Sequence, residues 1–280
     1  MKQRTRALVV MAGLMLILQG CGLARVGDSL GQGVRQNGDL DTVEAGLPSY
    51  LLMIDGLIVN WPERQSLLRT GADLYGAYAG LFVDDEARAA RLNARALDYA
   101  LRAACVHRDD YCRAREMDVP AFESLLAEAD NGDVPVLFTL GSAWAGYIQT
   151  HSDDWNAVAE LSRVRLLMER VVALDEGYQY GQAYMYLGVL NSLLPASLGG
   201  QPDAARDAFQ RAITLSNGDN LLARVLYAQH YARLVFDRDL HDEQLRRVLD
   251  ADVDVPDLTL QNAYAKREAR RLLDSADEYF

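Results

Sequence analysis

The sequence is poor in basic residues relative to acidic ones. It has 28 Lys and Arg against 40 Asp and Glu, which gives a formal net charge of −12 over 280 residues. Nucleic-acid binding needs clustered Lys and Arg, so this balance argues against DNA or RNA as a partner. It also argues against broad adsorption to an anionic bilayer. We interpret the excess of acid as a solvated surface.

Recognisable reaction motifs are also lacking. The sequence contains no HExxH, no P-loop and no GxSxG, and its four histidines (His107, His151, His230 and His241) lie far apart. Carboxylates are plentiful, but no spacing singles out a pair suited to glycoside hydrolysis. We therefore expect no enzymatic activity, no cofactor and no metal site. A polysaccharide-acting enzyme is kept as a distant third hypothesis.

Long hydrophobic runs are scarce, and the one at the amino terminus is informative. A basic start at residues 2–6 precedes an apolar run over 7–18, which is too short to span a membrane and is typical of a signal peptide. The run ends in LQGC, which resembles a bacterial lipobox whose Cys21 would accept a diacylglycerol. An ordinary secretory signal or a plain anchor helix are the alternatives. The acyl chains would make anchoring effectively permanent.

Three regions follow from this amino terminus. We predict a signal peptide at 1–20, a flexible Gly-rich tether at 21–40 that starts at lipidated Cys21, and one folded domain at 41–280. Gly22 after the cysteine favours the outer membrane over the inner one. Order is expected to begin near Asp41, which starts a capping-box spacing.

Only two cysteines, Cys105 and Cys112, remain after Cys21. An oxidising periplasm favours a disulfide between them. Free thiols are the alternative. A metal site fits less well, because His107 is the only nearby additional ligand and thiolate sites want four.

The rest of the sequence has the periodicity of helices. Apolar residues recur at spacings of three and four, and alternating strand patterns are nearly absent. The predicted helices form four pairs and a closing helix: 67–82 with 92–103, 136–148 with 161–174, 181–194 with 204–215, 220–236 with 242–250, and 258–280.

The third pair has the residue spacing of a tetratricopeptide repeat. Its small residues would let two helices approach, and its large ones would fill the space between pairs. The matching residues are Tyr184, Leu187, Gly188 and Asn191 in the first helix and Ala205, Phe209 and Ala212 in the second. The connection at 195–202 is longer than a standard turn. We predict an all-α domain of tetratricopeptide-like helix pairs, stacked into a compact solenoid with enlarged loops.

Three loops stand out as candidate binding surfaces. In Asp153–Asn156, an Asp could simply cap a helix while Trp155 folds onto the core, or Trp155 could be an exposed anchor for a partner. The Gly pair after Leu198 could be a turn that needs positive φ, and the charges around Arg238 could pair locally. The candidate ligand or partner residues are Trp144, Asp154, Trp155, Asn156, Gly199, Gly200, Arg238 and His241.

In series, several segments resemble the T-component family of tripartite ATP-independent periplasmic (TRAP) transporters. They are LYGAYAGLFVDD (74–85), LGSAWAGYIQ (140–149), DDWNA (153–157), YLGVLNSLLPASLGG (186–200), FQRAI (209–213), YARLVFDRDLHD (231–242) and LTLQN (258–262). The resemblance implies a periplasmic lipoprotein that forms a homotrimer, encloses a largely apolar cavity and docks the substrate-binding component of the transporter. A tetratricopeptide-type scaffold for envelope assembly, without a ligand, is the alternative.

Overall fold

The computed structural model describes residues 29 and 31–280, and no strand occurs among them. The all-α prediction is therefore confirmed for this part of the chain. The predicted signal peptide, Cys21 and Gly22 lie outside the described residues. Within the predicted tether, residues 31–35 form a short helix.

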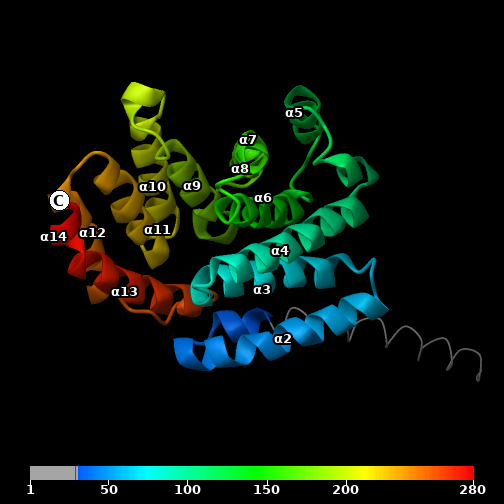
Figure 1. Ribbon diagram of the computed structural model, residues 1–280, viewed down its shortest axis with the longest axis horizontal. Coiled ribbons are helices and arrows are strands. Elements are labelled where there is room, and N and C mark those ends of the chain that lie inside the picture. The colour runs from blue at the N-terminus through cyan, green and yellow to red at the C-terminus, as the bar shows by residue number, and fades with distance from the viewer. Residues whose placement is uncertain (1–28, 30) are drawn as a thin grey trace, which may run out of the picture.

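The domain is a succession of helices with short 3₁₀ segments, drawn in Figure 1. In chain order they are α2 (Leu40–Asn60), α3 (Gln65–Phe82), α4 (Glu86–His107), η1 (Asp109–Arg113), α5 (Val119–Ala127), α6 (Val134–Gln149), α7 (Trp155–Ala159), α8 (Leu161–Leu174), α9 (Tyr178–Asn191), η2 (Ala196–Leu198), α10 (Pro202–Leu215), α11 (Leu221–Leu226), the π-helix η3 (Tyr227–Ala232), α12 (Arg238–Asp250), α13 (Thr259–Asp274) and α14 (Ala276–Tyr279).

Helix α2 starts slightly earlier than its sequence suggests. Its N-cap is Asp39, whose carboxylate accepts from the backbone N–H groups of Asp41 and Thr42 at 3.1 Å each. The capping box expected at Asp41 was therefore misplaced, because an acid two residues earlier already satisfies the first free N–H groups.

By length and composition α2 could also cross a membrane. One side of it is nevertheless part of the core of the domain, through Val43, Leu47, Leu51, Ile54 and Ile58. These residues recur at spacings of three and four, so they form a single stripe on the helix. Helix α2 packs against α3 through this stripe.

The helices then pack mostly against their neighbours in the chain. Helix α3 lies against α4, α4 against α6, α6 against α8, α8 against α9, and α9 against α10. Most of their buried residues form one continuous core, and a second, smaller core is formed by residues of α11, η3, α12 and α13.

The α9–α10 pair has the predicted small-to-large packing. Phe209 is fully buried and its ring lies directly against Gly188. Gly141 of α6 repeats the arrangement, because a Cβ there would lie 2.7 Å from Cε of Met168 on α8. Close helix contacts at a glycine therefore occur in two of the predicted pairs, α6 with α8 and α9 with α10.

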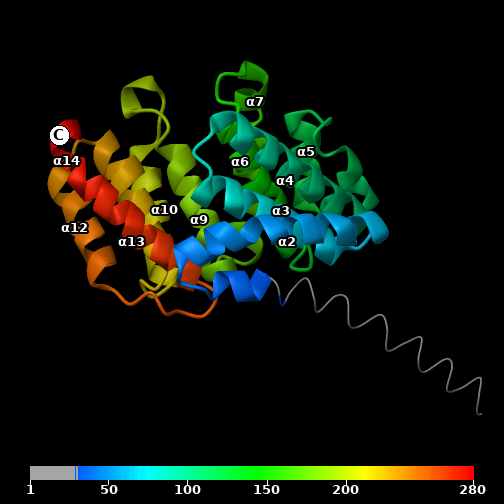
Figure 2. The ribbon, with the colours of Figure 1, turned by 60° about the horizontal axis from the view of Figure 1, so that its bottom comes forward.

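The last long helix lies against the beginning of the domain. Figures 1 and 2 show that α13 starts next to α2 and runs from there toward the C-terminus. Arg267 of α13 donates from Nη2 to the Leu81 carbonyl at 2.7 Å, and Arg35 Nε lies 3.4 Å from Asp257 Oδ1. The described part of the chain is thus closed on itself, which an open stack of repeats would not be. A tetratricopeptide-like solenoid over the whole domain remains a prediction.

Candidate functional site

Trp155 is the most exposed large hydrophobic side chain among the described residues, at 84 %. It opens the short helix α7, whose N-cap is Asp154. The Asp154 carboxylate accepts from Asn156 N at 2.9 Å and from Asn156 Nδ2 at 3.1 Å. The expected cap is present, but the interpretation that Trp155 folds onto the core was wrong. The cap instead holds the indole outward.

A second exposed apolar segment lies between α9 and α10. Leu193, Leu194 and Leu198 are 50 %, 48 % and 68 % exposed. Figure 2 shows this loop and α7 projecting from the same side of the molecule. We call Trp155 and these three leucines the apolar rim.

The two glycines of this loop are required by different features of the backbone. Gly199 has φ of +86°, as the predicted turn requires. A Cβ on Gly200 would lie 1.7 Å from the Leu194 carbonyl oxygen, so the close backbone approach excludes any side chain. Both glycines therefore have a backbone role in shaping the loop.

A groove of about 510 Å³ lies between α8, α9 and α10, at the foot of this loop. Its walls carry charged and polar groups as well as apolar ones. It is lined by Arg165, Glu169, Tyr184, Leu187, Asn191, Gln201, Ala204, Asp207, Ala208 and Arg211. Trp155 is not among these residues, so the apolar rim and the groove are separate features.

The polar groups of the groove are already paired with protein partners. Arg165 donates to Asn191 Oδ1 at 2.7 Å, and Arg211 donates from Nε to Glu176 Oε2 at 3.1 Å. The hydrogen bond from Arg211 lowers the pKa of Glu176, whereas desolvation raises the pKa of Tyr184, whose hydroxyl also bonds Glu176. The groove therefore combines paired charged groups with apolar wall residues such as Leu187 and Ala208. Whether it holds an apolar ligand stays a prediction.

Trp144, expected on a ligand or partner surface, is buried. Its side chain is fully covered, and its Nε1–H donates to Glu160 Oε2 at 2.8 Å. Glu160 also accepts from Arg115 Nε at 3.0 Å. The prediction was wrong because Glu160, between α7 and α8, accepts the indole N–H and so allows Trp144 to be buried. No sequence motif marks Glu160.

The predictions for α12 also need correction. His241 is fully buried beside the ring of Phe280, with 5.1 Å between centroids, so it belongs to no surface. Arg238 is exposed, but it pairs with Asp277 at the far end of the chain, where local pairing had been expected. Neither residue lines the groove.

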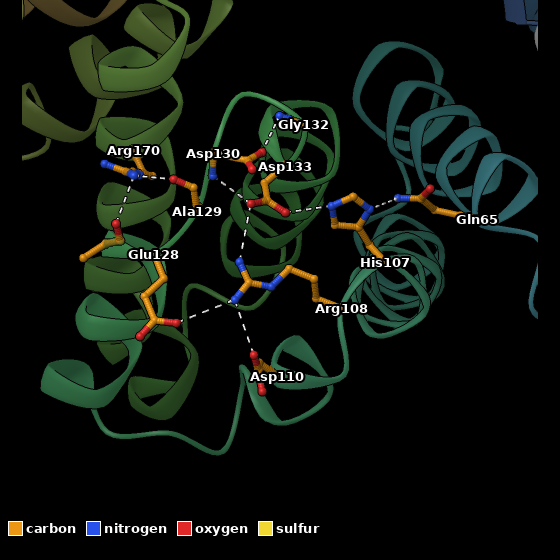
Figure 3. Close-up of polar contacts among 11 residues, drawn as sticks. Gln65, His107, Arg108, Asp110, Glu128, Ala129, Asp130, Gly132, Asp133 and Arg170 are labelled. Carbon is orange, nitrogen blue, oxygen red and sulfur yellow. Dashed lines mark hydrogen bonds and ion pairs between the residues drawn. The ribbon is translucent and has the colours of Figure 1, made fainter.

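Cys105 and Cys112 form a disulfide, with their Cα atoms 4.1 Å apart. It ties the last turn of α4 to η1, next to a network of polar side chains shown in Figure 3. Gln65 donates to His107 Nδ1 at 3.0 Å, so His107 Nε2–H donates to Asp133 Oδ1 at 2.7 Å.

The same network includes the guanidinium of Arg108. Arg108 lies 3.5 Å from Asp133 Oδ2, and that oxygen also accepts from the Asp130 backbone N–H at 2.8 Å. The buried Asp133 is thereby satisfied on both oxygens. Disulfide and network together fix the position of the α5–α6 turn. In the described part of the chain, no three His, Cys, Asp or Glu side chains form a group that could hold a metal ion.

The comparison with known families decides the broad identity. The family model for the TRAP transporter T-component matches residues 36–280. The chain belongs to this family. An uncharacterized protein of Treponema pallidum (strain Nichols) is 24 % identical over 260 residues, which covers 86 % of this chain and 80 % of that protein. The match covers all helices from α2 to α14, so the apolar rim, the groove and the disulfide all lie in the T-component region.

For a TRAP T-component, the residues that sequence reasoning singled out fall into three groups. The exposed side that carries the apolar rim contains Asp154, Trp155, Asn156, Gly199 and Gly200. Trp144 and His241 are core residues, and Arg238 is exposed away from the rim and paired with Asp277. Sequence reasoning missed Glu160, Asp55 and Asp73, since a lone carboxylate among 40 acidic residues gives no signal until its partners are known.

Proposed function

We propose that this T-component docks the soluble substrate-binding protein of its TRAP transporter through the apolar rim. The observation that carries the proposal is Trp155, a large indole that is 84 % exposed and held outward by the Asp154 cap. Tryptophan is enriched at the centres of protein interfaces, where burying it against a partner provides much of the binding energy. The exposed leucines on the same side extend this surface.

A lipid anchor on the T-component would explain what docking achieves. We infer that the mature protein is held in the periplasm by acylated Cys21, with the outer membrane favoured over the inner one. The acyl chains would confine the T-component to the membrane surface. A substrate-binding protein docked on it would then have a higher effective concentration near the membrane components of the transporter. The role is recruitment and needs no enzymatic step. An apolar ligand held by the same subunit is a further proposal, supported by the apolar wall residues Leu187, Ala204 and Ala208 of the groove.

We further infer that copies of the chain associate through the outer face of α2, as the homotrimer of the resemblance requires. Leu52 and Val59 are 75 % and 79 % exposed and lie two helical turns apart on one face. Between residues 45 and 62 the only charged side chain is Asp55. It points inward and accepts from the hydroxyls of Tyr75 at 2.8 Å and Tyr99 at 2.6 Å. An uncharged helix face of this length suits packing against an identical face.

The docking proposal is tested with the substrate-binding protein encoded beside this gene. Calorimetric titration should show that Trp155→Ala and Leu198→Ala each weaken binding about tenfold or more, with helical circular dichroism unchanged. Trp61→Ala is the matched control, because Trp61 is 38 % exposed and ends α2, which is not part of the apolar rim. Unchanged affinity of the Trp155 variant would refute the rim as the docking surface.

The alternative function is a scaffold for envelope assembly. Capture from the native envelope, followed by mass spectrometry, separates the two. Recovery of the transporter's binding protein supports docking, whereas recovery of assembly factors without it supports the scaffold.

A further inference from the structure

One face of α3 carries Arg69, Asp73, Gly76 and Gly80, which we call the α3 stripe. Spacings of four, three and four place these residues on one side of the helix. Asp73 and Gly80 are exposed, and a Cβ added to Gly76 or Gly80 would meet no atom within 4 Å. The stripe therefore borders open space, although α3 packs on its other sides against α2, α4 and α6.

Polar groups from two other helices lie around this stripe. Arg69 Nε donates to Thr139 Oγ1 of α6 at 3.4 Å, and the same hydroxyl acts against the rise that desolvation causes in the pKa of Asp73. On α9, desolvation raises the pKa of Tyr186, and the negative charge of Asp73 adds to this rise. Three helices thus bring hydroxyl, guanidinium and carboxyl groups together.

The surroundings of Asp73 are enclosed but reachable by water. Its side chain is solvent-accessible, yet desolvation raises its pKa to about 6. Both observations hold for a carboxyl that lines a recess, where water can touch it while protein surrounds it. Charge interactions are stronger in such a place than on an open surface.

The titratable groups that face Asp73 come from three elements. Arg69 lies on its own helix, Arg35 on the helix at residues 31–35, and Tyr186 on α9. Arg35 already forms an ion pair with Asp257. Arg69 and Asp73 have the i,i+4 spacing of a helical salt bridge, but no ion pair involving either occurs within residues 31–280, because Arg69 turns to Thr139.

We propose that the α3 stripe binds a small zwitterionic molecule of the free amino-acid class. Asp73 would receive its ammonium group and Arg69 its carboxylate. Side chains one turn apart have Cβ atoms about 6 Å from each other, so one small ligand can reach both charges. Both contacts would be charge-assisted hydrogen bonds, and the hydroxyl of Thr139 lies between them. The empty space at Gly76 and Gly80 would accept the ligand's side chain.

The test is calorimetric titration of the full chain in detergent at pH 7.5 with L-alanine and L-leucine. We expect at least one of them to bind. Its analogues with one charge removed should bind at least tenfold more weakly: propionate and ethylamine for alanine, 4-methylpentanoate and isoamylamine for leucine. Absence of binding by both amino acids overturns the proposal. Equal binding of an analogue also overturns it, since the site would then recognise one charge alone.

Substitutions assign the two charges. Asp73→Asn and Arg69→Gln should each weaken binding at least tenfold, while Asp98→Asn, an exposed acid on α4 paired with Arg102, should not. Because the ammonium group needs ionised Asp73, affinity should fall when the pH is lowered from 7.5 to 5, and this fall should vanish in Asp73→Asn. An unchanged affinity in that variant, or the same pH effect in both proteins, refutes the assignment.

This inference does not depend on the docking proposal. Asp73→Asn should still capture the substrate-binding protein, and Trp155→Ala should still bind the amino acid. Each proposal can therefore fail without the other.

Discussion

Gly188 and Phe209 fit together so closely that neither position tolerates a change of size. A Cβ at Gly188 would lie 2.7 Å from the Phe209 ring, and Phe209 is fully buried. Phe209→Ala should leave a cavity and lower the free energy of unfolding by about 3–5 kcal/mol, which lowers Tm by about 10 °C. Thermal melting followed by circular dichroism measures this.

The reverse substitution is the companion experiment. Gly188→Ala should destabilise by overpacking, and combining it with Phe209→Leu should recover part of the loss, because the clashing ring is gone. A Phe209→Ala variant that melts within about 2 °C of wild type would show that the α9–α10 contact is not as described.

The disulfide should be present in protein purified without reductant. Mass mapping of the peptide that contains Cys105 and Cys112 should show the linked form, and two alkylatable thiols would contradict it. Cys105→Ser together with Cys112→Ser should cost roughly 2–3 kcal/mol, because the closed loop is short.

Lipidation at Cys21 predicts a simple phenotype. Cells labelled with a radioactive fatty acid should incorporate label into the wild-type chain and not into Cys21→Ser, which should accumulate as precursor or soluble protein. Cys105→Ser is the control, since it should keep the label. Label retained in the Cys21 variant would show that Cys21 is not the acylated residue.

Association through α2 predicts that Leu52→Glu yields a monomer. The new charge would be buried at the contact between copies without an ionic partner, which is costly. Light scattering after size exclusion should show the shift in mass, and the helical circular dichroism should stay the same because Leu52 is 75 % exposed in the single chain. Leu198→Glu is the control. Leu198 lies in the loop between α9 and α10, so this variant should keep the wild-type mass.

His230 should make the domain less stable in mild acid. Desolvation lowers the pKa of His230 from 6.5 to about 4, and Arg233 adds to the effect. The native state therefore prefers the neutral ring. Its contribution to stability is present above pH 6.5 and is lost as the pH falls toward 4. The loss of Tm between pH 7 and pH 4.5 should be smaller in His230→Gln than in wild type, and equal losses would contradict the assignment.

The helices were predictable where one apolar stripe controls them. The stripe at 161–174 gives α8 with both ends correct, and the long connections around 155 and 198 were apparent from their Pro, Gly and Asp residues. Helix α5 was missed, since nine residues give too few repeats for a period to stand out. The π-helix at 227–232 was also missed, because the shift in side-chain register that it causes is confined to six residues and is too short to stand out as a change of period.

The candidate site was less predictable than the fold. Exposure of Trp155 and burial of Trp144 depend on whether a polar partner lies within reach of the indole, and only Trp144 has one, Glu160. The two tryptophans look alike in sequence. The same holds for Asp55 and Asp73, because their roles come from tyrosines and hydroxyls on other helices.

The bond between Arg267 and the Leu81 carbonyl joins residues 186 positions apart. In a linear array of repeats, each unit contacts only its neighbours, and terminal units can be removed or fray without loss of the rest. Here the closing contact must wait until nearly the whole chain has been made, which raises the contact order and slows folding. Removing α13 should therefore unfold helices at the amino-terminal end, and the domain should melt in a single cooperative transition.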